Sequence, residues 1–380
     1  MADQDPPSAR IETGIADIDA AQWDALAGPR DPFASHAFLA LLETSGSVGE
    51  GTGWSSAPIL VEQGGKTIGA VPTYLKSHSQ GEYVFDHGWA DAFERAGGRY
   101  YPKLLGAIPF TPCPGPRLLG AHKAMTLAAM ETVTVENGLS GAHLNFVEAE
   151  DVAAARARGW LVRDGLQFHW KNRGYADFDD FLASLTSRRR KTIRKERARA
   201  MDGLSVETLR GAEIDAQAAD AMWAFYQDTG SRKWGRPYLT RDFFERMVEA
   251  LGDRLLLFLA RDEAGIPVAG ALNVVGEDTL YGRYWGCIEE RPFLHFELSY
   301  YRALDWAIAH GIATVQAGAQ GEHKVVRGYE PVITRSVHFL PDPGFREAVA
   351  KFLEGERAAV REEARYYEGM LPYSSPNTET

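Results

Sequence analysis

The chain has 380 residues, of which 45% are hydrophobic, 24% are charged and 11% are aromatic. This composition is typical of a globular protein and excludes collagen-like, coiled-coil and wholly disordered chains, while the length indicates two domains. Lys and Arg number 41 against 52 Asp and Glu, which gives a net charge of −11. An acidic chain of this kind is a poor general binder of nucleic acid or anionic membranes.

The positive charge is concentrated in one segment. Between Arg188 and Arg199 lie eight basic residues and one acidic residue, so this segment carries +7 and the rest of the chain carries −18. A charge run of this kind is either a solvated face or a site for an anionic partner, and its isolation in an acidic chain favours the partner.

The ends and the cysteines indicate where the protein works. Residues 1–10 contain no apolar run that a secretory signal would need, and no apolar run approaches the roughly 20 residues that cross a bilayer. Cys113 and Cys287 have no metal-ligand spacing and give no sign of a disulfide scaffold. We therefore expect a cytoplasmic protein without a bound metal, with peripheral contact at the inner face of the membrane as a further possibility.

The first half of the chain alternates between helical and strand patterns. The expected elements are helices at 18–26 and 33–44, strands at 57–62, 67–75 and 82–86, a Gly- and Pro-rich stretch at 97–120, a helix at 123–137, a strand at 143–147, a helix at 151–158 and a strand at 160–170.

The second half repeats this order. The expected elements are helices at 178–200, 216–228 and 241–250, strands at 254–261, 267–275 and 279–287, a helix at 294–310, a strand at 313–317, a turn or short helix at 322–328, a strand at 332–340 and a long helix at 344–367.

This element order resembles that of an acyl-CoA N-acyltransferase (GNAT-type) domain, and two tandem copies fit the length. We therefore expect an α/β fold of tandem GNAT-like domains, with mixed central sheets flanked by helices. The expected boundaries are 10–172 for the first domain, 173–342 for the second with a basic helix at 187–200, and 343–370 for a C-terminal helix. A single large mixed α/β domain is the alternative.

Several stretches carry a more specific resemblance. They are YYPKL at 100–104, PFTP at 109–112, SRRRKTIRKER at 187–197, FLHFEL at 293–298 and GAQGEHKVVRGY at 318–329. Over residues 10–370 the chain resembles the FemAB-like branch of the GNAT superfamily, which is labelled peptidoglycan biosynthesis/recognition. The resemblance implies transfer of an acyl or aminoacyl group to an amine.

One segment departs from the GNAT pattern. GNAT enzymes that bind acetyl-CoA usually carry Gln/Arg-x-x-Gly-x-Gly/Ala after the fourth strand, where backbone N–H groups hold the pyrophosphate. The equivalent residues 287–293 contain two carboxylates and no glycine. The expected co-substrate is therefore acyl-CoA or another acyl thioester held in a different way, or an aminoacyl-tRNA.

Candidates for the chemistry cluster directly after the strand at 313–317. Amide formation needs a base, oxyanion donors and an anchor for the phosphates of the donor. Glu322, His323 and Lys324 are the candidate catalytic residues of this segment, although a solvated Gly-rich turn would look the same. The candidate ligands for substrate or phosphate beside them are Gly318, Gln320, Gly321 and Arg327.

Glu297 is a fourth catalytic candidate, because it lies between apolar neighbours near the start of the helix at 294–310. A structural hydrogen-bond partner is an equal alternative. His295, two residues earlier, would point about 200° away on a helix, so the two are not expected to share a site.

Two further groups could bind substrate. The basic helix offers a surface for tRNA, for the phosphates of an acyl donor or for lipid head groups, and the first half offers an acceptor pocket. The residues of the basic helix are Arg188, Arg189, Arg190, Lys191 and Arg194, and those of the pocket are Asp86, His87, Tyr101 and Lys103.

We therefore expect an N-acyltransferase that joins an acyl group from a phosphate-bearing donor to a primary amine. The alternatives are aminoacyl-tRNA-dependent transfer to a peptidoglycan precursor, N-acylation of a lipid amine such as a long-chain base, and a non-catalytic module that binds an anion.

Overall fold

The computed structural model describes residues 6–233, 237–318 and 321–374. The chain divides into two units, each assembled from three segments, whereas the domains expected from the sequence are continuous. Unit 1 comprises Met1–Gly165, Tyr238–Phe243 and Ile333–Arg361, and unit 2 comprises Leu166–Pro237, Phe244–Val332 and Glu362–Thr380.

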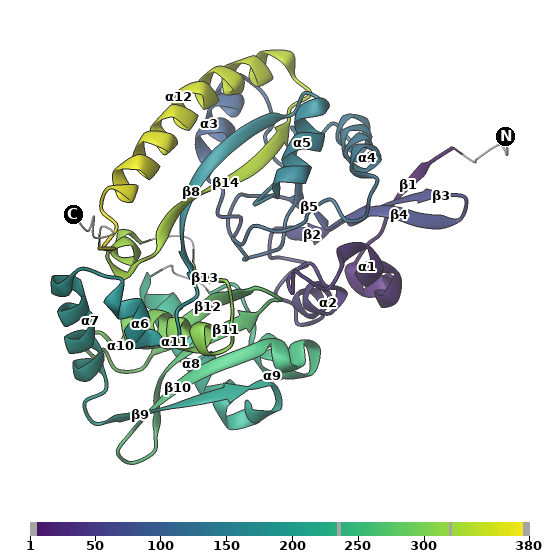
Figure 1. Ribbon diagram of the computed structural model, residues 1–380. Coiled ribbons are helices and arrows are strands. Elements are labelled where there is room, and N and C mark those ends of the chain that lie inside the picture. Colours follow the sequence, from purple (N-terminus) through teal and green to yellow (C-terminus); the bar gives the residue numbers. More distant parts are fainter. Residues whose placement is uncertain (1–5, 234–236, 319–320, 375–380) are drawn as a thin grey trace. The chain divides into compact units, whose positions relative to one another are not determined.

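Unit 1 combines two sheets with flanking helices (Figure 1). Its strands are β1 (Ser8–Ile11), β2 (Trp54–Ser56), β3 (Ile59–Gln63), β4 (Lys66–Val71), β5 (Thr73–Lys76), β6 (Lys103–Gly106), β7 (Ala142–Leu144) and most of β14 (Glu330–Phe339). β2, β5, β6, β7 and β14 are neighbours in this order, with β6 and β7 parallel and the other pairs antiparallel. β1, β3 and β4 form a separate antiparallel sheet.

The helices of unit 1 begin where the sequence supplies caps. Asp19 accepts a hydrogen bond from the Gln22 backbone at the start of the first helix, and Ser35 accepts one from the Phe38 backbone at the start of the second. The helices are α1 (Ala20–Ala27), α2 (His36–Thr44), α3 (His87–Arg95), α4 (Lys123–Glu136), α5 (Ala149–Ala157) and the first part of α12 (Pro343–Glu368).

Two apolar clusters hold unit 1 together. The larger joins α4 to strands β3, β4, β6 and β7 through side chains such as Val61, Leu104 and Leu127. The smaller joins α3 to α12 through Trp89, Phe345 and their neighbours. Because the second cluster draws on the last tenth of the chain, unit 1 depends on residues far beyond its first segment.

Unit 2 is built on a mixed sheet. Its strands are β9 (Leu204–Arg210), β10 (Leu255–Asp262), β11 (Pro267–Val275), β12 (Thr279–Cys287), β13 (Thr314–Ala317) and the second part of β8 (Leu161–Lys171). Their order is β8, β13, β12, β11, β10, β9, and β12 and β13 are the parallel pair among antiparallel neighbours. The helices are α6 (Phe178–Ala183), α7 (Ser187–Ala200), α8 (Ala216–Lys233), α9 (Arg241–Leu251), α10 (Leu294–Phe296) and α11 (Arg302–Ala309).

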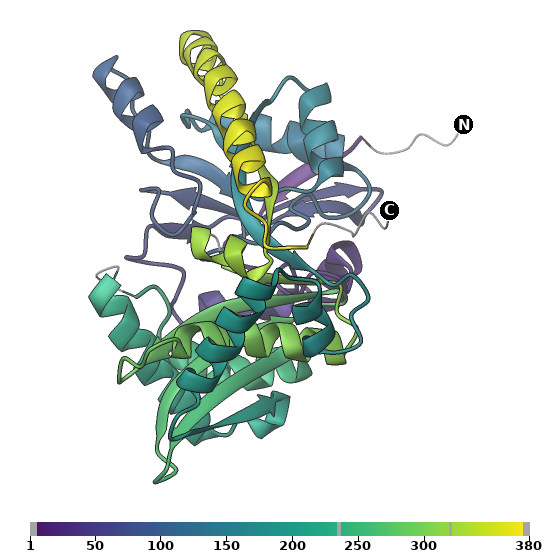
Figure 2. The ribbon, with the colours of Figure 1, turned by 60° about the vertical axis from the view of Figure 1, so that its left-hand side comes forward.

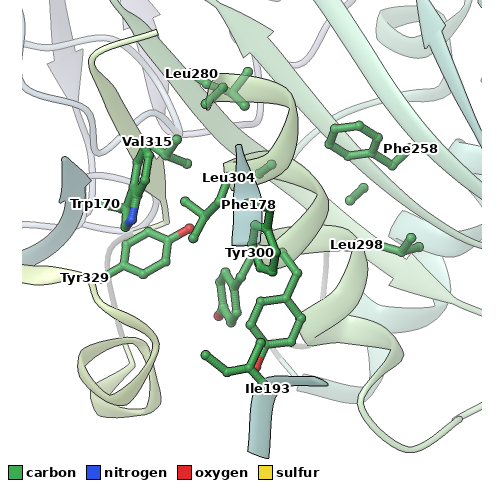
Figure 3. Packing of buried hydrophobic residues seen from close by; sticks show 14 of the residues in the cluster. Trp170, Phe178, Ile193, Phe258, Leu280, Leu298, Tyr300, Leu304, Val315 and Tyr329 are labelled. Carbon is green, nitrogen blue, oxygen red and sulfur yellow. The ribbon is translucent and has the colours of Figure 1, made fainter. Parts of the chain in front are cut away.

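The main core of unit 2 lies between this sheet and the helices α6, α7, α10 and α11. Leu256, Phe258 and Ala260 alternate along β10 and face this core, as strand geometry requires. Figure 3 shows Phe258 and Leu280 of the sheet with Trp170, Leu304 and Tyr329 in the same cluster.

The observed elements follow most of the expected order, with five differences, the first being that the strand expected at 67–75 is divided into β4 and β5, which lie in different sheets. Residues 82–86 are not a strand but lead into α3, and the helix expected at 178–200 is broken between α6 and α7. The helix expected at 294–310 contains a π-helical turn at Glu297–Tyr301. The sequence patterns also missed β1, β2, β6 and β9, which are short or largely exposed strands with little periodicity of their own.

Candidate functional site

The parallel strands β12 and β13 separate partway along unit 2. β12 pairs with β13 over Thr279–Gly282 and continues to Cys287, whereas β13 ends at Ala317. A cavity of about 150 Å³ lies where they part. It is lined by Ala271, Leu272, Asn273, Gly282, Arg283, Tyr284, Trp285, His295, Ser299, Tyr300, Ala317 and Gly318.

A bulge in β12 shapes one wall of this cavity. Leu272 pairs with Tyr284 while Asn273 pairs with Gly282, so Arg283 is the extra residue. Bulges bend a strand and redirect side chains, and they are common beside functional sites. The bulge falls at the position where β12 leaves β13.

The opposite wall carries groups that can move protons. The hydroxyl of Tyr300 lies 2.8 Å from Nε2 of His323, and the ring of His295 lies 5.2 Å from the Tyr300 ring. Burial raises the pKa of Tyr300, so its phenol stays protonated at neutral pH. Tyr300 and Ser299 come from the π-helical turn, a feature that is frequent at functional sites. The hydroxyl of Ser299 is buried and has no hydrogen-bond partner among the described residues.

Lys324 lies in the 3₁₀ turn Glu322–Arg327 that follows β13. Its side chain is buried, and Nζ donates a hydrogen bond of 2.6 Å to the carbonyl of Gly318, which lines the cavity. Burial lowers the pKa of Lys324 to about 7, since no carboxylate in the described part of the chain forms an ion pair with it. Charged and neutral amine are therefore both populated near neutral pH.

Two of the sequence candidates are engaged in internal networks. Glu297 is fully buried, and its two oxygens accept hydrogen bonds of 2.9–3.1 Å from Arg197 and Arg302. Arg327 donates to the Tyr301 hydroxyl, the His323 carbonyl and Glu196. Both residues are thus positioned as structural partners, and neither lines the cavity.

The other candidates of the segment 318–327 differ in exposure. Glu322 and His323 are exposed, whereas Gly321 is half-buried and has a backbone φ of +123°, which favours glycine. Gln320 lies outside the described residues.

The basic helix is α7, with the bounds that the sequence predicts. Arg194 pairs with Asp179 at 2.8 Å, and Arg190 donates to the carbonyl of Ala183. Arg188 and Lys191 are exposed and Arg189 is half-buried, and none of them forms an ion pair within the described ranges.

The candidates of unit 1 separate into a buried group and an exposed residue. Lys103 is fully buried and donates to Glu82 and Ser79 at 2.8 Å and also to Asp86. Tyr101 contacts Ser79 at 2.8 Å, so three of the four candidates share one network. His87, the fourth, is exposed on the first turn of α3 and does not join them.

This buried group titrates unusually. Burial acts to raise the pKa of both carboxyls, and the Lys103 ammonium opposes it. The result is a pKa of about 7 for Glu82 and a lowered pKa for Asp86.

No group of three His, Cys, Asp or Glu in the described part of the chain could hold a metal ion, and no helix there is long and apolar enough to span a bilayer.

The sequence did not identify Tyr300, Ser299 and Asn273 as cavity residues, and it did not place His295 among the candidate site residues. One signal was available: His295 and Ser299 are four residues apart, the spacing that places two side chains on one face of a helix.

A mixed sheet with a bulged central strand and a parallel pair that separates at a cavity defines a GNAT-type fold. The family model for FemAB-like proteins, described as peptidoglycan biosynthesis/recognition, matches residues 14–375. The chain therefore belongs to the FemAB-like family.

Solved structures show the same fold. FemX is 15% identical, with a TM-score of 0.54 over 88% of this chain and 98% of its own. The C-terminal domain (DUF2156) of a putative lysylphosphatidylglycerol synthetase from Agrobacterium fabrum is 9% identical, with a TM-score of 0.51 over 87% of this chain and 94% of its own. A tandem GNAT protein from the clavulanic acid biosynthesis pathway is 12% identical, with a TM-score of 0.46 over 89% of this chain and 99% of its own. No curated protein matches the sequence.

The described sheets and helices, with the likeness to FemX, give the tandem GNAT-like α/β fold with a long C-terminal helix, which confirms the expectation from the sequence. Membership of the FemAB-like family points to a transferase.

Proposed function

We propose that the chain is an amide-forming N-acyltransferase that moves an acyl group from a thioester donor to a primary amine in the cavity between β12 and β13. The supporting observation is the meeting of Tyr300, His295 and the part of β12 beyond its pairing with β13 at one cavity. Each supplies a different requirement of acyl transfer.

The strand backbone suits the donor. The pairing of β12 with β13 ends at Gly282 and Ala317, whereas β12 continues to Cys287. An extended arm that carries amide groups, as a carrier thioester does, would lie along this part of β12 as an added strand does. The donor is then held by its arm, and the absent Gly-rich loop is not required.

The transfer balances with groups on the cavity wall. His295 takes a proton from the substrate ammonium, and the free amine attacks the thioester carbonyl to form the C–N bond. The nitrogen, positively charged after the attack, releases its second proton to solvent, the C–S bond breaks, and the leaving thiolate takes the proton of the Tyr300 hydroxyl. His323, hydrogen-bonded to that hydroxyl, returns a proton from solvent.

The test is product formation by purified protein. Acyl-CoA thioesters of several chain lengths are incubated with primary amines, and amide products are detected by mass spectrometry. Tyr300→Phe keeps the ring packing but removes the acid, so we expect kcat/KM to fall by about 10²–10⁴-fold. Tyr366→Phe is the matched control, because Tyr366 is 65% exposed and lies outside the cavity.

Equal rates for Tyr300→Phe and Tyr366→Phe would refute the assigned role of Tyr300. Binding of donor without any amide product would instead favour a non-catalytic module. Location in the cytoplasm, with contact at the inner membrane face through α7, belongs to the same proposal.

An aminoacyl-tRNA donor is the second candidate. The observation in its favour is the exposed cations of α7, which are the natural complement of a phosphate backbone. Incubation with tRNA that carries a radiolabelled amino acid, with a peptidoglycan precursor or an aminolipid as acceptor, separates this donor from a thioester.

A further inference from the structure

The cavity of unit 2 is lined by two polar residues that the proposed transfer does not use. They are Asn273 of β11 and Ser299 of the π-helical turn. This turn and α11 lie against one face of the sheet of unit 2 (Figures 1 and 2), where their apolar residues join the main core. What Asn273 and Ser299 can bind therefore says something about the substrate.

Asn273 interrupts an apolar row of β11. Ala269, Ala271 and Val275 pack in or against the main core of unit 2, and Asn273 falls between the last two in the same alternation. The register agrees, because Asn273 lies opposite Leu256, whose side chain is part of that core. Asn273 is only 1% exposed, so a buried amide stands where an apolar side chain would pack without a cost in desolvation.

The hydrogen bonds of Asn273 fix the orientation of its amide. Nδ2 donates to the carbonyl of Ala271 at 3.1 Å and to that of Leu256 at 3.4 Å, and both partners can only accept. Oδ1 forms no hydrogen bond with the described residues, and a Cβ at Gly282, which also lines the cavity, would lie 3.5 Å from it. Asn273 therefore presents an acceptor at the cavity.

Ser299 adds a hydroxyl on the helical side. Its Oγ is buried and has no hydrogen-bond partner in the described part of the chain, although buried polar atoms usually have one. The π-helical turn packs against β11, and both line the same cavity. A hydroxyl can donate as well as accept, so Ser299 can serve a ligand that Asn273 also contacts.

The two side chains together favour a hydroxyl on the ligand. A carboxylate only accepts and would face the Asn273 oxygen. An ammonium only donates, and the described lining contains Arg283 but no Asp or Glu that could pair with a lasting positive charge. A hydroxyl is the smallest group that donates to Asn273 while it accepts from Ser299.

The volume limits the rest of the bound group. The cavity of about 150 Å³ holds roughly six carbon atoms, the size of benzene. In the proposed function the donor arm lies along β12 beyond Gly282, so the acyl group at its end is the part that reaches the wall formed by β11 and β12. The hydroxyl would then lie within a few carbons of the thioester carbonyl.

We infer that the cavity binds a short acyl group that carries a hydroxyl, and that Asn273 and Ser299 select it. The inference deepens the proposed function and rests on it for the role of this group as the acyl donor. It also disfavours an aminoacyl donor, because the described lining gives its ammonium no partner.

Isothermal titration without an amine measures this selection apart from turnover. The ligands are the two enantiomers of 3-hydroxybutanoyl-CoA and butanoyl-CoA, which share one carbon chain. We expect one enantiomer at least to bind about tenfold more tightly than butanoyl-CoA, because the plain chain leaves both polar groups unpaired. Equal affinities would mean that water pairs with these groups and would overturn the inference, as would a failure of all three to bind.

Two variants locate the selection. Ser299→Ala removes the hydroxyl, and Gly282→Ala places a methyl group beside Oδ1 of Asn273 at ordinary contact distances. Each should lower the affinity ratio of the hydroxyacyl to the plain thioester by about fivefold or more. Ser336→Ala and Gly355→Ala are the matched controls, a buried serine of β14 and an exposed glycine of α12, and should keep the wild-type ratio. An unchanged ratio in both cavity variants refutes the assignment.

Urea unfolding provides a readout without any ligand. The Ser299 hydroxyl has no partner in the described chain, so Ser299→Ala should not lower the urea midpoint. Ser336→Ala removes a contact of 2.9 Å with His338 and should lower it. Equal losses in the two variants would give Ser299 a structural role and contradict the inference.

The two proposals fail separately. Selective binding of the hydroxyacyl thioester without amide formation from any amine would leave the selection intact and refute the proposed function. Amide formation at equal rates from the hydroxyacyl and plain thioesters would refute the selection and leave the proposed function in place.

Discussion

Two adjacent tyrosines take different parts in unit 2. The Tyr300 hydroxyl contacts His323 at the cavity, whereas the Tyr301 hydroxyl donates to Glu196 and accepts from Arg327 in the network below. Neighbouring residues on a helix point about 100° apart, so Tyr300 reaches the cavity whereas Tyr301 joins the hydrogen-bond network that packs beneath it. Glu297 belongs to that support with two arginines, which is why a carboxylate can be buried there without being catalytic.

The sequence predicted part of this site. Lys324 could be found because chemistry-bearing residues gather directly after a strand, where α/β proteins place their ligands. Tyr300 could not be found in this way. It lies in a π-helical turn, where the side chains no longer follow the 3.6-residue period of an α-helix that sequence patterns assume. The burial of the Arg327 side chain could not be predicted either, because its partner Glu196 lies 131 residues away along the chain.

A buried lysine in unit 1 gives a pH-dependent prediction. Lys76 is fully buried, with Nζ 3.7 Å from the centre of the Trp54 ring, and burial lowers its pKa from 10.5 to about 7. Between pH 7 and 10.5 the unfolded chain holds a proton that the folded chain has lost. The free energy of unfolding therefore rises with pH in this window by up to about 1.4 kcal/mol per pH unit from this residue.

Lys76→Met removes this contribution. Between pH 7 and 9.5 the unfolding free energy of the variant should lack the rise with pH that Lys76 causes in the wild type, and below pH 6.5 the two curves should be parallel. Urea unfolding at several pH values measures the difference. Lys66→Met serves as control, because Lys66 is exposed at the start of β4. Parallel curves for the wild type and Lys76→Met above pH 7 would contradict the prediction.

At the scale of elements, α7 has two distinct faces. Ile193 and Ala200 are buried in unit 2, whereas Arg188, Lys191 and Lys195 lie along an exposed face. Two cations near the helix N-terminus also oppose the helix dipole. These cations therefore lower the stability of the helix itself, as expected where a helix surface binds anions.

Replacing Arg188, Lys191 and Lys195 with Gln should weaken binding of tRNA and of anionic vesicles, because three phosphate partners are lost. In a plot of log affinity against log salt concentration, the slope should become shallower by about one unit per cation removed for tRNA. Fluorescence anisotropy at several salt concentrations measures it. Lys351→Gln is the control, on the exposed side of α12. Equal slopes for the wild type and the triple variant would show that these cations are solvated and do not contact the tRNA phosphates.

The expected elements were most accurate where periodicity was strong. β10 begins with six apolar residues in succession and β11 is apolar except for Asn273, and the bounds of β10, β11 and β12 differ by one residue at most from expectation. The break between α6 and α7 was missed because it depends on tertiary contacts. There the Thr186 backbone donates to the Pro372 carbonyl, and Ser374 donates to Ser184.

At the scale of the whole molecule, α12 supplies core residues to both units. Phe345, Val349 and Leu353 are buried in unit 1, and Tyr367 is buried against Phe168 in unit 2. Burial of each apolar side chain contributes about 1.5–3 kcal/mol, so the three in unit 1 account for a large share of the 5–15 kcal/mol typical of a domain.

A chain that ends at residue 341 should therefore lose cooperative unfolding and bind a hydrophobic dye such as ANS. A chain that ends at Ser374 is the control, because it keeps these core residues. Differential scanning calorimetry and dye fluorescence compare the two. A sharp thermal transition in the shorter chain would show that α12 is dispensable.

The interleaved segments also determine when unit 1 can be completed during synthesis. Residues 1–165 leave the ribosome long before residues 333–361, which complete the same unit. At about 5–20 residues per second the delay is roughly 10–40 s, far longer than most domains need to fold. Until then the apolar residues of α3 that pack against α12 lack their partners, so we expect the nascent chain to bind chaperones during translation.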